Sequence, residues 1–371
     1  MKVAHLTSVH YRFDIRIFHK MCSSLSLYGH DVTLVVADGL GNEIQNGIKV
    51  VDVGSSKGRR DRILNAPDRI LAVALKLDAD IYHLHDPELW PIGASLKRSG
   101  HRVIFDSHED IPKQILSKPY LNKAMLWVIS HVLRVYEAWV CREFDGVIAA
   151  TPFIRDKFLH INLDTVTINN FPRLNELLSQ VSWESKRREV CYVGGIGKIR
   201  GILEMVQSMG EVKTGTRLNL CGRFDEPSIE ATARAQLGWD AVNELGFLDR
   251  PAVREVLARS IAGLVVFHPS PNHIDAQPNK IFEYMSAGIP VIASNFPLWR
   301  QIVEGNSCGL CVDPLKPTEI ASAIDYLVTN PNEAQSMGQN GRRAVEDSYS
   351  WSKEEKKLLA FYHQIHGRSP K

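Results

Sequence analysis

Residues 268–294, HPSPNHIDAQPNKIFEYMSAGIPVIAS, contain the pattern that best indicates the fold. The apolar run AGLVVFH leads into this stretch at 262–268, and VIAS ends it at 291–294. Between these two strands, Pro278 can occupy the first turn of a helix because the N–H group that it lacks has no partner there. Gly288 and Pro290 end that helix. A strand, a helix and a second strand in this order predict a βαβ unit of a parallel sheet.

The same alternation of apolar runs and amphipathic segments continues along the whole chain, in two series. The first series has strands at KVAHLTS, HDVTLVVAD, DIYHLHD, RVIFDSHED and GVIAATP, with a helix at 17–28 after the first strand. The second has them at EVCYVGG, RLNLCG, AVNELGF, AGLVVFH, PVIAS and GLCVD. The sequence therefore predicts two α/β domains, at 1–173 and 190–349, joined by the polar linker 174–189. An amphipathic helix follows at 350–366.

Composition limits the classes of function that are open to the chain. Its 371 residues are 44% hydrophobic and 23% charged, which suits two domains that each bury a core. A net charge of +2 without a long run of one sign argues against nucleic-acid binding. We see no secretory signal and no run of about 18 continuous apolar residues, so we expect a cytoplasmic chain. The six cysteines, including the pair Cys308 and Cys311, are those of reduced thiols rather than a zinc site.

The start of the helix within 268–294 is suited to bind phosphate. Free N–H groups and the helix dipole both favour an anion at that position, and Lys280 adds a positive charge in the first turn. Glu283 lies about one turn further along, and Asp275 lies in the loop before the helix. A ligand with hydroxyls, then phosphates, then hydroxyls matches this order, and a nucleotide sugar has that layout. A loop and helix with one acid is by itself also a common structural element.

A second element, YVGGIGKIRGI at 192–202, strengthens the prediction of a phosphate site. Gly194 and Gly195 allow the backbone to approach an anionic ligand, and Arg200 can bind a phosphate through two N–H groups. Arg200 stands where a dinucleotide fingerprint would have its third glycine, and no Gly-Lys-Ser/Thr of a nucleotide-triphosphatase loop follows. The pattern therefore argues against a dehydrogenase and against a nucleotide triphosphatase.

Taken in order, these motifs resemble those of retaining glycosyltransferases of family 4. The resemblance covers essentially the full chain through HLTSVHYRFDIRIFHKMCSSL, HLHDPEL, FDSHEDIP, YVGGIGKIRG and PNKIFEYMSAGIPVIAS. It implies the GT-B architecture, in which two facing Rossmann-like domains with parallel sheets enclose an interdomain cleft. The helix at 350–366, with Trp351, resembles the one that crosses back onto the first domain in that fold.

The resemblance also implies a set of site residues. Glu283 would hold the ribose hydroxyls and Asp275 would face the transferred sugar, where most relatives have glutamate. Arg200 falls on the usual lysine position of the diphosphate clamp, Gly195 falls on the usual arginine position, and His108 resembles the histidine that contacts the donor sugar. The predicted catalytic residues are His108, Asp275, Arg200 and Lys280. The predicted donor-binding residues are Gly194, Gly195, Arg200, Arg223, Gln277, Pro278, Asn279, Lys280, Ile281 and Glu283. On the acceptor side the predicted residues are Asp14, Arg16, His85, Asp86 and Glu109.

By the same resemblance, the expected reaction is sugar transfer with retention of anomeric configuration, without a metal or another cofactor. The expected donor is a UDP-sugar rather than a GDP-sugar. The expected acceptor is a glycan or a polyprenyl-linked sugar of bacterial surface polysaccharide, such as lipopolysaccharide O-antigen, capsule or exopolysaccharide. That would place the enzyme at the inner face of the cytoplasmic membrane as a peripheral protein. Two alternatives stay open: a sugar-nucleotide epimerase of the same fold, and a non-catalytic nucleotide-sugar-binding subunit. We interpret the apolar residues of Met125–Trp139 as core packing rather than membrane contact.

Overall fold

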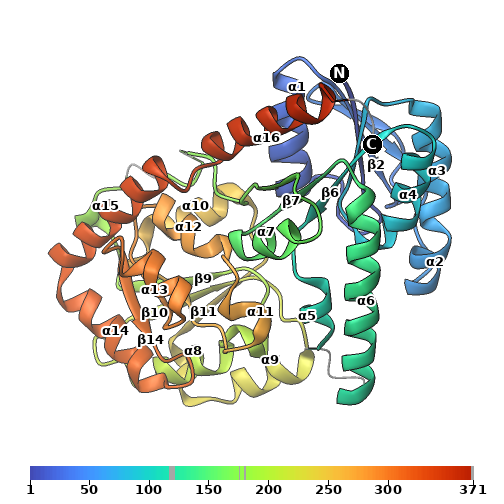
Figure 1. The fold of residues 1–371 in the computed structure, drawn as a ribbon. Helices are drawn as coiled ribbons and strands as arrows, with labels where there is room; N and C mark the ends of the chain where they lie inside the picture. Colours follow the sequence, from blue (N-terminus) through green and yellow to red (C-terminus); the bar gives the residue numbers. More distant parts are fainter. Residues whose placement is uncertain (117–121, 175, 179–180, 369–371) are drawn as a thin grey trace. The chain divides into compact units, whose positions relative to one another are not determined.

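The structure, a computed structural model, describes residues 1–116, 122–174, 176–178 and 181–368. The chain divides into two compact units, and each is described by itself. One consists of Met1–Asn170 together with Lys353–Lys371, and the other of Phe171–Ser352. In each unit helices cover both faces of a sheet whose strands are mostly parallel (Figure 1). The predicted α/β fold class is therefore confirmed.

The sheet of the first unit has eight strands in the order β3-β4-β2-β1-β5-β6-β7-β8. All neighbouring strands are parallel except the pair β3 and β4. The strands are β1 (Lys2–Leu6), β2 (Asp31–Val36), β3 (Glu43–Gln45), β4 (Ile48–Asp52), β5 (Ile81–Leu84), β6 (Arg102–Ser107), β7 (Gly146–Ala149) and β8 (Thr165–Thr167). The helices are η1 (Ile15–Cys22), α1 (Ser23–Leu27), α2 (Arg59–Leu64), α3 (Ala66–Leu77), η2 (Pro87–Leu89), α4 (Trp90–Arg98), α5 (Ile111–Leu116), α6 (Lys123–Glu143), α7 (Pro152–Leu159) and α16 (Trp351–His366), which belongs to this unit from Lys353 onwards.

The two faces of this sheet differ in polarity. Ala4 and Leu6 of β1 and Leu84 of β5 face an apolar core that α3, α4, α6 and α7 cover. Because side chains alternate along a strand, His5 and His83 point to the opposite face, beneath α16. This second face buries imidazoles and carboxylates, and it leads to the carboxyl ends of β1, β5 and β6.

The first helix of this unit differs from the predicted one. The sequence predicted a regular helix over 17–28, whereas the structure has the π-helix η1 followed by the short α1. The Asp14 carboxylate caps η1 by accepting hydrogen bonds from the N–H groups of Arg16 and Ile17, at 2.8 and 2.9 Å. The wider turn of a π-helix shifts the direction of its side chains, and such turns are frequent at functional sites.

The sheet of the second unit has six parallel strands in the order β11-β10-β9-β12-β13-β14. They are β9 (Glu189–Val193), β10 (Arg217–Cys221), β11 (Val242–Gly246), β12 (Ala262–Val265), β13 (Val291–Ser294) and β14 (Gly309–Val312), and all six were predicted. The helices are η3 (Trp183–Ser185), η4 (Lys198–Arg200), α8 (Ile202–Met209), α9 (Pro227–Arg234), η5 (Leu237–Ala241), α10 (Arg250–Arg259), α11 (Pro271–Ile274), α12 (Asn279–Ser286), α13 (Pro297–Val303), α14 (Pro317–Thr329) and α15 (Pro331–Asp347). Residues 174–189, the predicted linker, fall within this unit.

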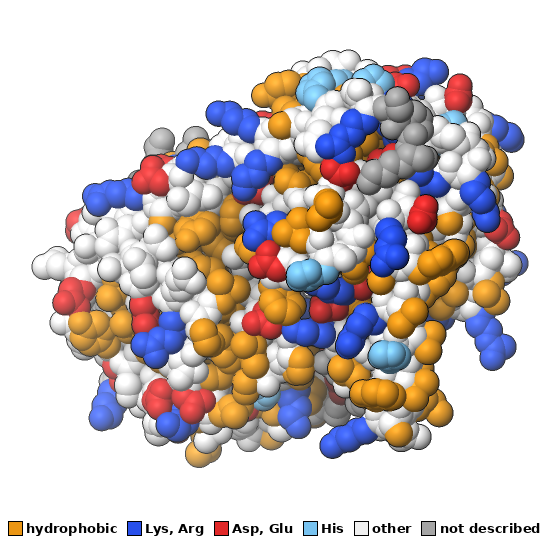
Figure 2. Space-filling view, viewed as in Figure 1, with side chains coloured by type: hydrophobic (Ala, Val, Ile, Leu, Met, Phe, Trp, Pro, Cys, Tyr) orange, Lys and Arg blue, Asp and Glu red, His pale blue; other side chains and the backbone are white. Residues whose placement is uncertain are grey.

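Helix α6 corrects the interpretation of Met125–Trp139 as core packing. Leu126 and Val140 are buried, but six of its large apolar residues are exposed: Met125, Trp127, Val128, Val132, Val135 and Trp139. Hydrophobic side chains gather over this helix in Figure 2. Among the described residues, α6 is the one helix that is long and apolar enough to cross a membrane, judged by length and composition alone.

Candidate functional site

Helix α12 begins where the sequence predicted it, directly after Pro278. Pro278 is extended, with φ −63° and ψ 130°, and Gly288 follows the helix with φ +71°. The Trp299 indole N–H donates to the carbonyl oxygen of Ala276 at 2.8 Å, which fixes the loop before the helix. The position of the first N–H groups of α12, and of the positive end of its dipole, is therefore fixed by the loop before the helix.

Two cationic side chains converge on the carboxyl end of β9. A Cβ atom at Gly194 would meet the Lys280 ammonium, and one at Gly195 would collide with the Arg200 guanidinium, which donates to the Gly195 carbonyl oxygen at 2.8 Å. Burial, and then the charge of Arg200, lower the pKa of Lys280 to about 8. Among the described residues, no carboxylate oxygen lies within 4.0 Å of either cation. Two unpaired, partly desolvated cations next to a helix start favour the binding of an anion.

Glu283, one turn into α12, is already paired. Its carboxylate accepts a hydrogen bond from Nη1 of Arg250 at 2.8 Å, and Nε of Arg250 donates to Glu176 at 2.7 Å. Burial lowers the pKa of Arg250, but the charges of Glu283 and Glu176 outweigh it, so the net shift is upward. A hydroxyl group that binds Glu283 would therefore share the carboxylate with Arg250.

The loop between β12 and α12 is held from both ends. His268 lies with Nε2 at 2.9 Å from the Glu204 carboxylate, and the His273 ring lies 3.2 Å from the His268 carbonyl oxygen. Asp275 directly follows α11 and is half-buried. Gln277 has its Oε1 atom buried without a hydrogen-bond partner among the described residues. Such an unsatisfied acceptor is suited to receive a hydroxyl or N–H group of a ligand.

The loop after β10 adjoins the loop after β9. A Cβ atom at Gly222 would collide with the Gly194 carbonyl oxygen, and the Ile196 N–H donates to the Arg223 carbonyl oxygen at 2.9 Å. The Arg223 guanidinium lies 5.1 Å from the centroid of the Phe247 ring and lines a hollow at the ends of β10 and β11. Arg223 thus lies in the loop after β10, next to the loop after β9 that carries the glycine pair.

In the first unit, three polar side chains converge on Asp106 at the end of β6. Arg16 donates to both of its carboxylate oxygens, at 2.9 and 2.8 Å. Nδ1 of His85 and Nε2 of His108 lie 3.3 and 3.4 Å from the same Oδ2 atom. Burial opposes ionisation of the fully buried Asp106, but the Arg16 charge holds its pKa well below the usual range. Asp106 therefore fixes the orientation of these side chains through its negative charge.

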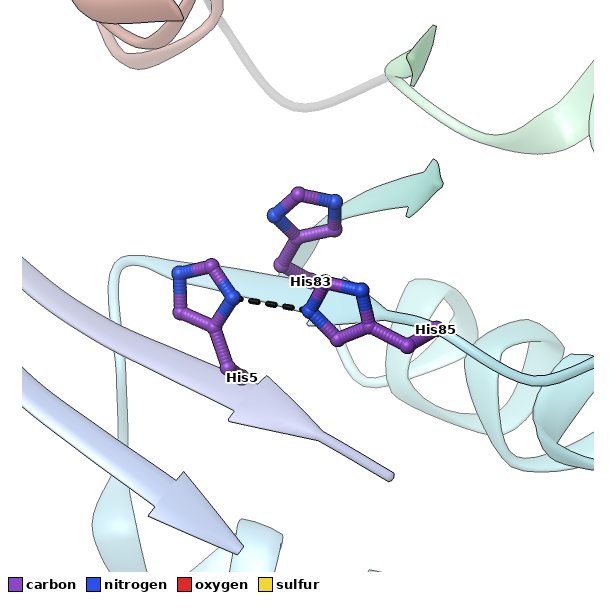
Figure 3. Close-up of side chains that lie close together, drawn as sticks. All are labelled: His5, His83 and His85. Atoms are coloured by element: carbon purple, nitrogen blue, oxygen red, sulfur yellow. Dashed lines mark hydrogen bonds between the residues drawn. The ribbon is translucent and has the colours of Figure 1, made fainter. Parts of the chain in front are cut away.

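A row of buried imidazoles continues from this carboxylate (Figure 3). Nδ1 of His5 lies 2.9 Å from Nε2 of His85, and Nδ1 of His83 lies 2.6 Å from the Tyr362 hydroxyl. The same hydroxyl lies 3.3 Å from Nε2 of His5, so a chain of polar contacts runs from α16 to Asp106. Burial lowers the pKa of His85 to about 3 and those of His5 and His83 well below their usual range. These rings are therefore neutral at neutral pH.

Asp86, at the end of β5, organises the loop after β1. Its Oδ2 atom accepts from the Thr7 hydroxyl at 2.8 Å and from the Ser8 N–H at 2.6 Å, and its Oδ1 atom lies 3.0 Å from Nδ1 of His10. Burial opposes ionisation, yet the His10 contact brings the pKa of Asp86 to about 2. The His10 ring also stacks on the His108 ring, with centroids 5.0 Å apart. His10 and His108 form the partly exposed rim of this network.

Comparison with known protein families shows which family the chain belongs to. The family described as "Glycosyl transferases group 1" matches residues 175–344, and "Glycosyltransferase Family 4" matches residues 16–171. The chain belongs to the group 1 glycosyltransferases. Among curated proteins, a glycogen synthase of Mycobacterium tuberculosis is 21% identical over 61% of this chain and 56% of that protein. The chain thus spans about half the length of that relative. An uncharacterised glycosyltransferase of Methanocaldococcus jannaschii is 22% identical over 76% and 75% of the two chains.

Solved structures share the fold of this group 1 glycosyltransferase over nearly its full length. Sucrose-phosphate synthase from Thermosynechococcus elongatus has a TM-score of 0.78 at 17% identity and covers 98% of both chains. Anabaena HepE in complex with UDP-glucose has a TM-score of 0.76 at 15% identity, over 98% of this chain and 100% of that one. These likenesses confirm the predicted GT-B fold.

In this family member, the polar face of the first unit contains two groups of side chains that could hold a metal ion. The groups are His5, His83 and His85, and His85, Asp106 and His108. In the first, a proton must lie between the rings of His5 and His85 for their hydrogen bond to form. In the second, Arg16 already supplies the positive charge that Asp106 needs. Both groups are thus more suited to a hydrogen-bonded network than to a metal centre.

The predicted acceptor-side residues each make a contact within the first unit. Arg16 and His85 are buried behind His108 and contact Asp106, and Asp14 caps η1. Asp86 binds the loop after β1, and Glu109 accepts a hydrogen bond from Gln114. Among the predicted donor residues, Ile281 has its side chain in the core, whereas Asn279 is exposed at the start of α12.

Asp106, His5 and Arg250 are among the residues that matter here and were not predicted. Asp106 and His5 lie inside strands, at positions of the motifs FDSHED and KVAHLTS that otherwise hold apolar residues. A charged or ionisable residue at such a position needs a buried partner, and this signal could have identified both. Arg250 carries no comparable signal, because its two carboxylate partners are 74 and 33 residues away.

Proposed function

We propose that this chain transfers a sugar from a nucleotide-diphosphate donor to a glycan or lipid-linked acceptor, with retention of anomeric configuration. The observation that carries the proposal is the convergence of Lys280 and Arg200 on Gly194 and Gly195, without a carboxylate partner among the described residues. The donor diphosphate supplies the negative charge that such a site lacks. The start of α12, after Pro278, adds its free N–H groups.

Each part of the donor then has a group to bind it. Glu283 would hold the ribose hydroxyls, with Arg250 keeping its carboxylate oriented. Asp275 and the unsatisfied Gln277 lie in the loop before the diphosphate position and would face the transferred sugar. His108 stays a predicted sugar contact, and its ring is held by Asp106 and stacked by His10. Arg223 would lie near the nucleotide base of the donor.

The proposed mechanism relies on electrostatic stabilisation and positioning. As the bond between sugar and diphosphate breaks, Lys280 and Arg200 stabilise the charge on the leaving diphosphate. The departing phosphate oxygen takes the proton of the acceptor hydroxyl, so no separate protein base is needed. In this proposal the two cations do what a divalent ion does elsewhere, and transfer proceeds without metal. Inverted product, or activity lost in EDTA and restored by divalent ions, would contradict this mechanism.

A UDP-sugar is the donor class that we favour. Structures that share the fold were solved in complex with UDP, with UDP-glucose and with UDP-2-fluoro glucose. The named relatives include glycogen synthase, alpha-D-kanosaminyltransferase and alpha-maltose-1-phosphate synthase, whose names point to different acceptors. The acceptor that we propose, a polyprenyl-linked sugar of surface polysaccharide, comes from the sequence resemblance alone.

One experiment separates this proposal from its alternatives. A thermal-shift screen with UDP-, GDP- and ADP-sugars identifies the donor class, because a ligand that binds the folded state raises the melting temperature. The stabilising donor is then incubated with and without a mixture of glycan and polyprenyl-linked acceptors. Release of nucleotide diphosphate that depends on acceptor supports a transferase. Interconversion of the sugar without acceptor would indicate an epimerase, and binding without turnover would indicate a non-catalytic subunit.

Glu283→Gln tests the assignment of the ribose. Loss of a charge-assisted hydrogen bond of about 1.5–3 kcal/mol should weaken UDP binding by about 10- to 100-fold. Glu304→Gln is the matched control, because Glu304 also pairs with an arginine but lies in an exposed i,i+4 pair. Isothermal titration calorimetry measures both variants. Equal UDP affinity for the Glu283 variant and the control would remove Glu283 from the donor site.

A further inference from the structure

Helix α6, of 21 residues, carries an outward apolar face that the described residues of its own unit leave exposed. We define the α6 apolar face as Met125, Trp127, Val128, Val132, Val135 and Trp139. Trp127, Val132 and Trp139 are 64, 60 and 63% exposed. Val128, Val132, Val135 and Trp139 follow one another at helical spacing and form a single stripe. A contiguous patch of this kind on a monomer marks a binding surface.

The inward face of α6 is already fixed to the first unit. Leu126, Val140 and Cys141 are buried there, and the Ser130 hydroxyl donates to the Pro112 carbonyl oxygen at 2.7 Å. The fully buried Glu137 forms an ion pair with Lys157 of α7 at 2.5 Å. The outward face therefore stays exposed when the helix packs on the first unit. Packing against that unit does not explain why this face is apolar.

The exposed charges around the apolar face are mostly positive, with Glu143 as the exposed carboxylate of the helix. Lys123, Arg134 and Arg142 are exposed at its first end, its flank and its last end. The carboxylates of the helix are the buried Glu137 and Glu143, which is its last residue. Trp127 stacks on the exposed His131, with ring centroids 5.6 Å apart and planes 10° apart. An apolar face with tryptophans and flanking lysine and arginine is typical of helices that lie in a membrane interface.

We propose that the α6 apolar face inserts into the headgroup region of a membrane that contains anionic phospholipid. Its residues extend over 14 helical steps, which corresponds to about 21 Å along the helix axis. The helix lies in the interface and does not span the bilayer, because a span would expose Glu137 to hydrocarbon and break its pair with Lys157. Anionic headgroups complement Lys123, Arg134 and Arg142.

A second copy of the chain fits this face less well than a membrane does. Pairing two identical faces about a twofold axis would bring these lysine and arginine side chains of both copies to one interface, where few carboxylates are available. The proposal stands on α6 and does not depend on the sugar transfer proposed above. If the acceptor is lipid-linked, the same contact would bring the enzyme to its substrate.

Vesicle flotation of the full chain tests the proposal, without any sugar donor. Vesicles consist of phosphatidylcholine alone or of phosphatidylcholine with phosphatidylglycerol. We expect binding to the anionic vesicles that decreases with salt, and at least a tenfold decrease for the double variant Val132→Glu/Val135→Glu. Leu237→Glu is the control, because Leu237 is 95% exposed in the second unit. Arg134→Glu keeps the apolar face and should weaken binding to anionic vesicles by at least threefold.

Melting temperatures of all variants show whether they fold, and the exposure of both valines predicts values close to wild type. Failure of the wild-type chain to bind either vesicle type would overturn the proposal. Equal binding by the wild type and the valine double variant would overturn it too. A dimer in light scattering that the double variant loses, without vesicle binding by the wild type, would assign the face to self-association instead.

Discussion

Asp106 shows how single residues determine the polar face of the first unit. Its carboxylate is fully buried, and the nearly buried Arg16 binds it through two hydrogen bonds. A buried charge without its partner is strongly unfavourable, so neither residue can change alone without cost. His85 and His108 then take their orientation from the same oxygen atom. The order of the whole network depends on one side chain inside a strand.

Replacing Asp106 by asparagine should therefore destabilise the protein. The change keeps the shape but leaves the Arg16 charge buried and unpaired, which costs about 3–5 kcal/mol of the free energy of unfolding. Urea denaturation measures this loss. Asp156→Asn is the control, because Asp156 pairs with Arg155 on the surface and should change stability by less than about 1 kcal/mol. Similar values for both variants would contradict the role given to Asp106.

The buried imidazoles predict a decrease of stability in acid. In the folded state burial holds the pKa values of His5, His83 and His85 below the ordinary value of 6.5. Below that value the unfolded chain takes up protons that the folded chain does not, so stability is complete above pH 6.5 and falls as the pH decreases towards 3. Each ring contributes up to about 1.4 kcal/mol per pH unit.

Urea denaturation at pH 7.5, 6.5 and 5.5 checks this expectation. His83→Asn should reduce the pH dependence between 6.5 and 5.5, whereas His131→Gln on the exposed face of α6 should not. A free energy of unfolding that stays constant over this range would mean that the three rings are not neutral and buried as the structure has them.

At the level of elements, local signals predicted strands and helix ends well. Strands β9 to β14 are short apolar runs between polar segments, and Pro278 and Gly288 bound α12 as expected. The hairpin of β3 and β4 was missed, although Asn46 and Gly47 have the positive φ angles that an Asn-Gly turn predicts. The outward face of α6 was misjudged because helical spacing shows where apolar residues gather and not which side is covered.

Gly263 of β12 determines how closely α12 packs against the sheet. A Cβ atom there would collide with the ring of Tyr284, whose hydroxyl accepts a hydrogen bond from the Val193 N–H at 3.1 Å. Gly263→Ala should cost about 1–3 kcal/mol of stability and should also weaken UDP binding, since α12 carries Lys280.

Tyr284→Phe separates these two effects. It keeps the ring and removes only the hydrogen bond, so we expect a loss of about 1 kcal/mol of stability and nearly unchanged UDP affinity. Urea denaturation and calorimetric titration measure both variants. Wild-type UDP affinity in a stably folded Gly263→Ala protein would show that the position of α12 does not matter to the donor.

On the scale of the whole molecule, the sequence identified the family and the two parallel sheets but not the partners of its buried charges. Asp106 and Arg16 are 90 residues apart, and Arg250 meets Glu283 and Glu176 from a third element. Such pairs exist only after the chain has folded, so spacing along the sequence does not show them. The glycine pair at the end of β9 could be predicted as part of a phosphate site because Arg200 follows it within a few residues.

The central claim is that a nucleotide diphosphate binds at Lys280 and Arg200 without metal, and calorimetric titration of UDP in EDTA tests it most directly. Lys198→Gln is the matched control, because Lys198 lies two residues before Arg200 in η4 but is exposed. We predict that UDP binds the wild type and the control with similar affinity, and that Lys280→Gln weakens binding by about 10-fold or more. Equal affinity for Lys280→Gln and the wild type, or UDP binding that requires a divalent ion, would contradict the account.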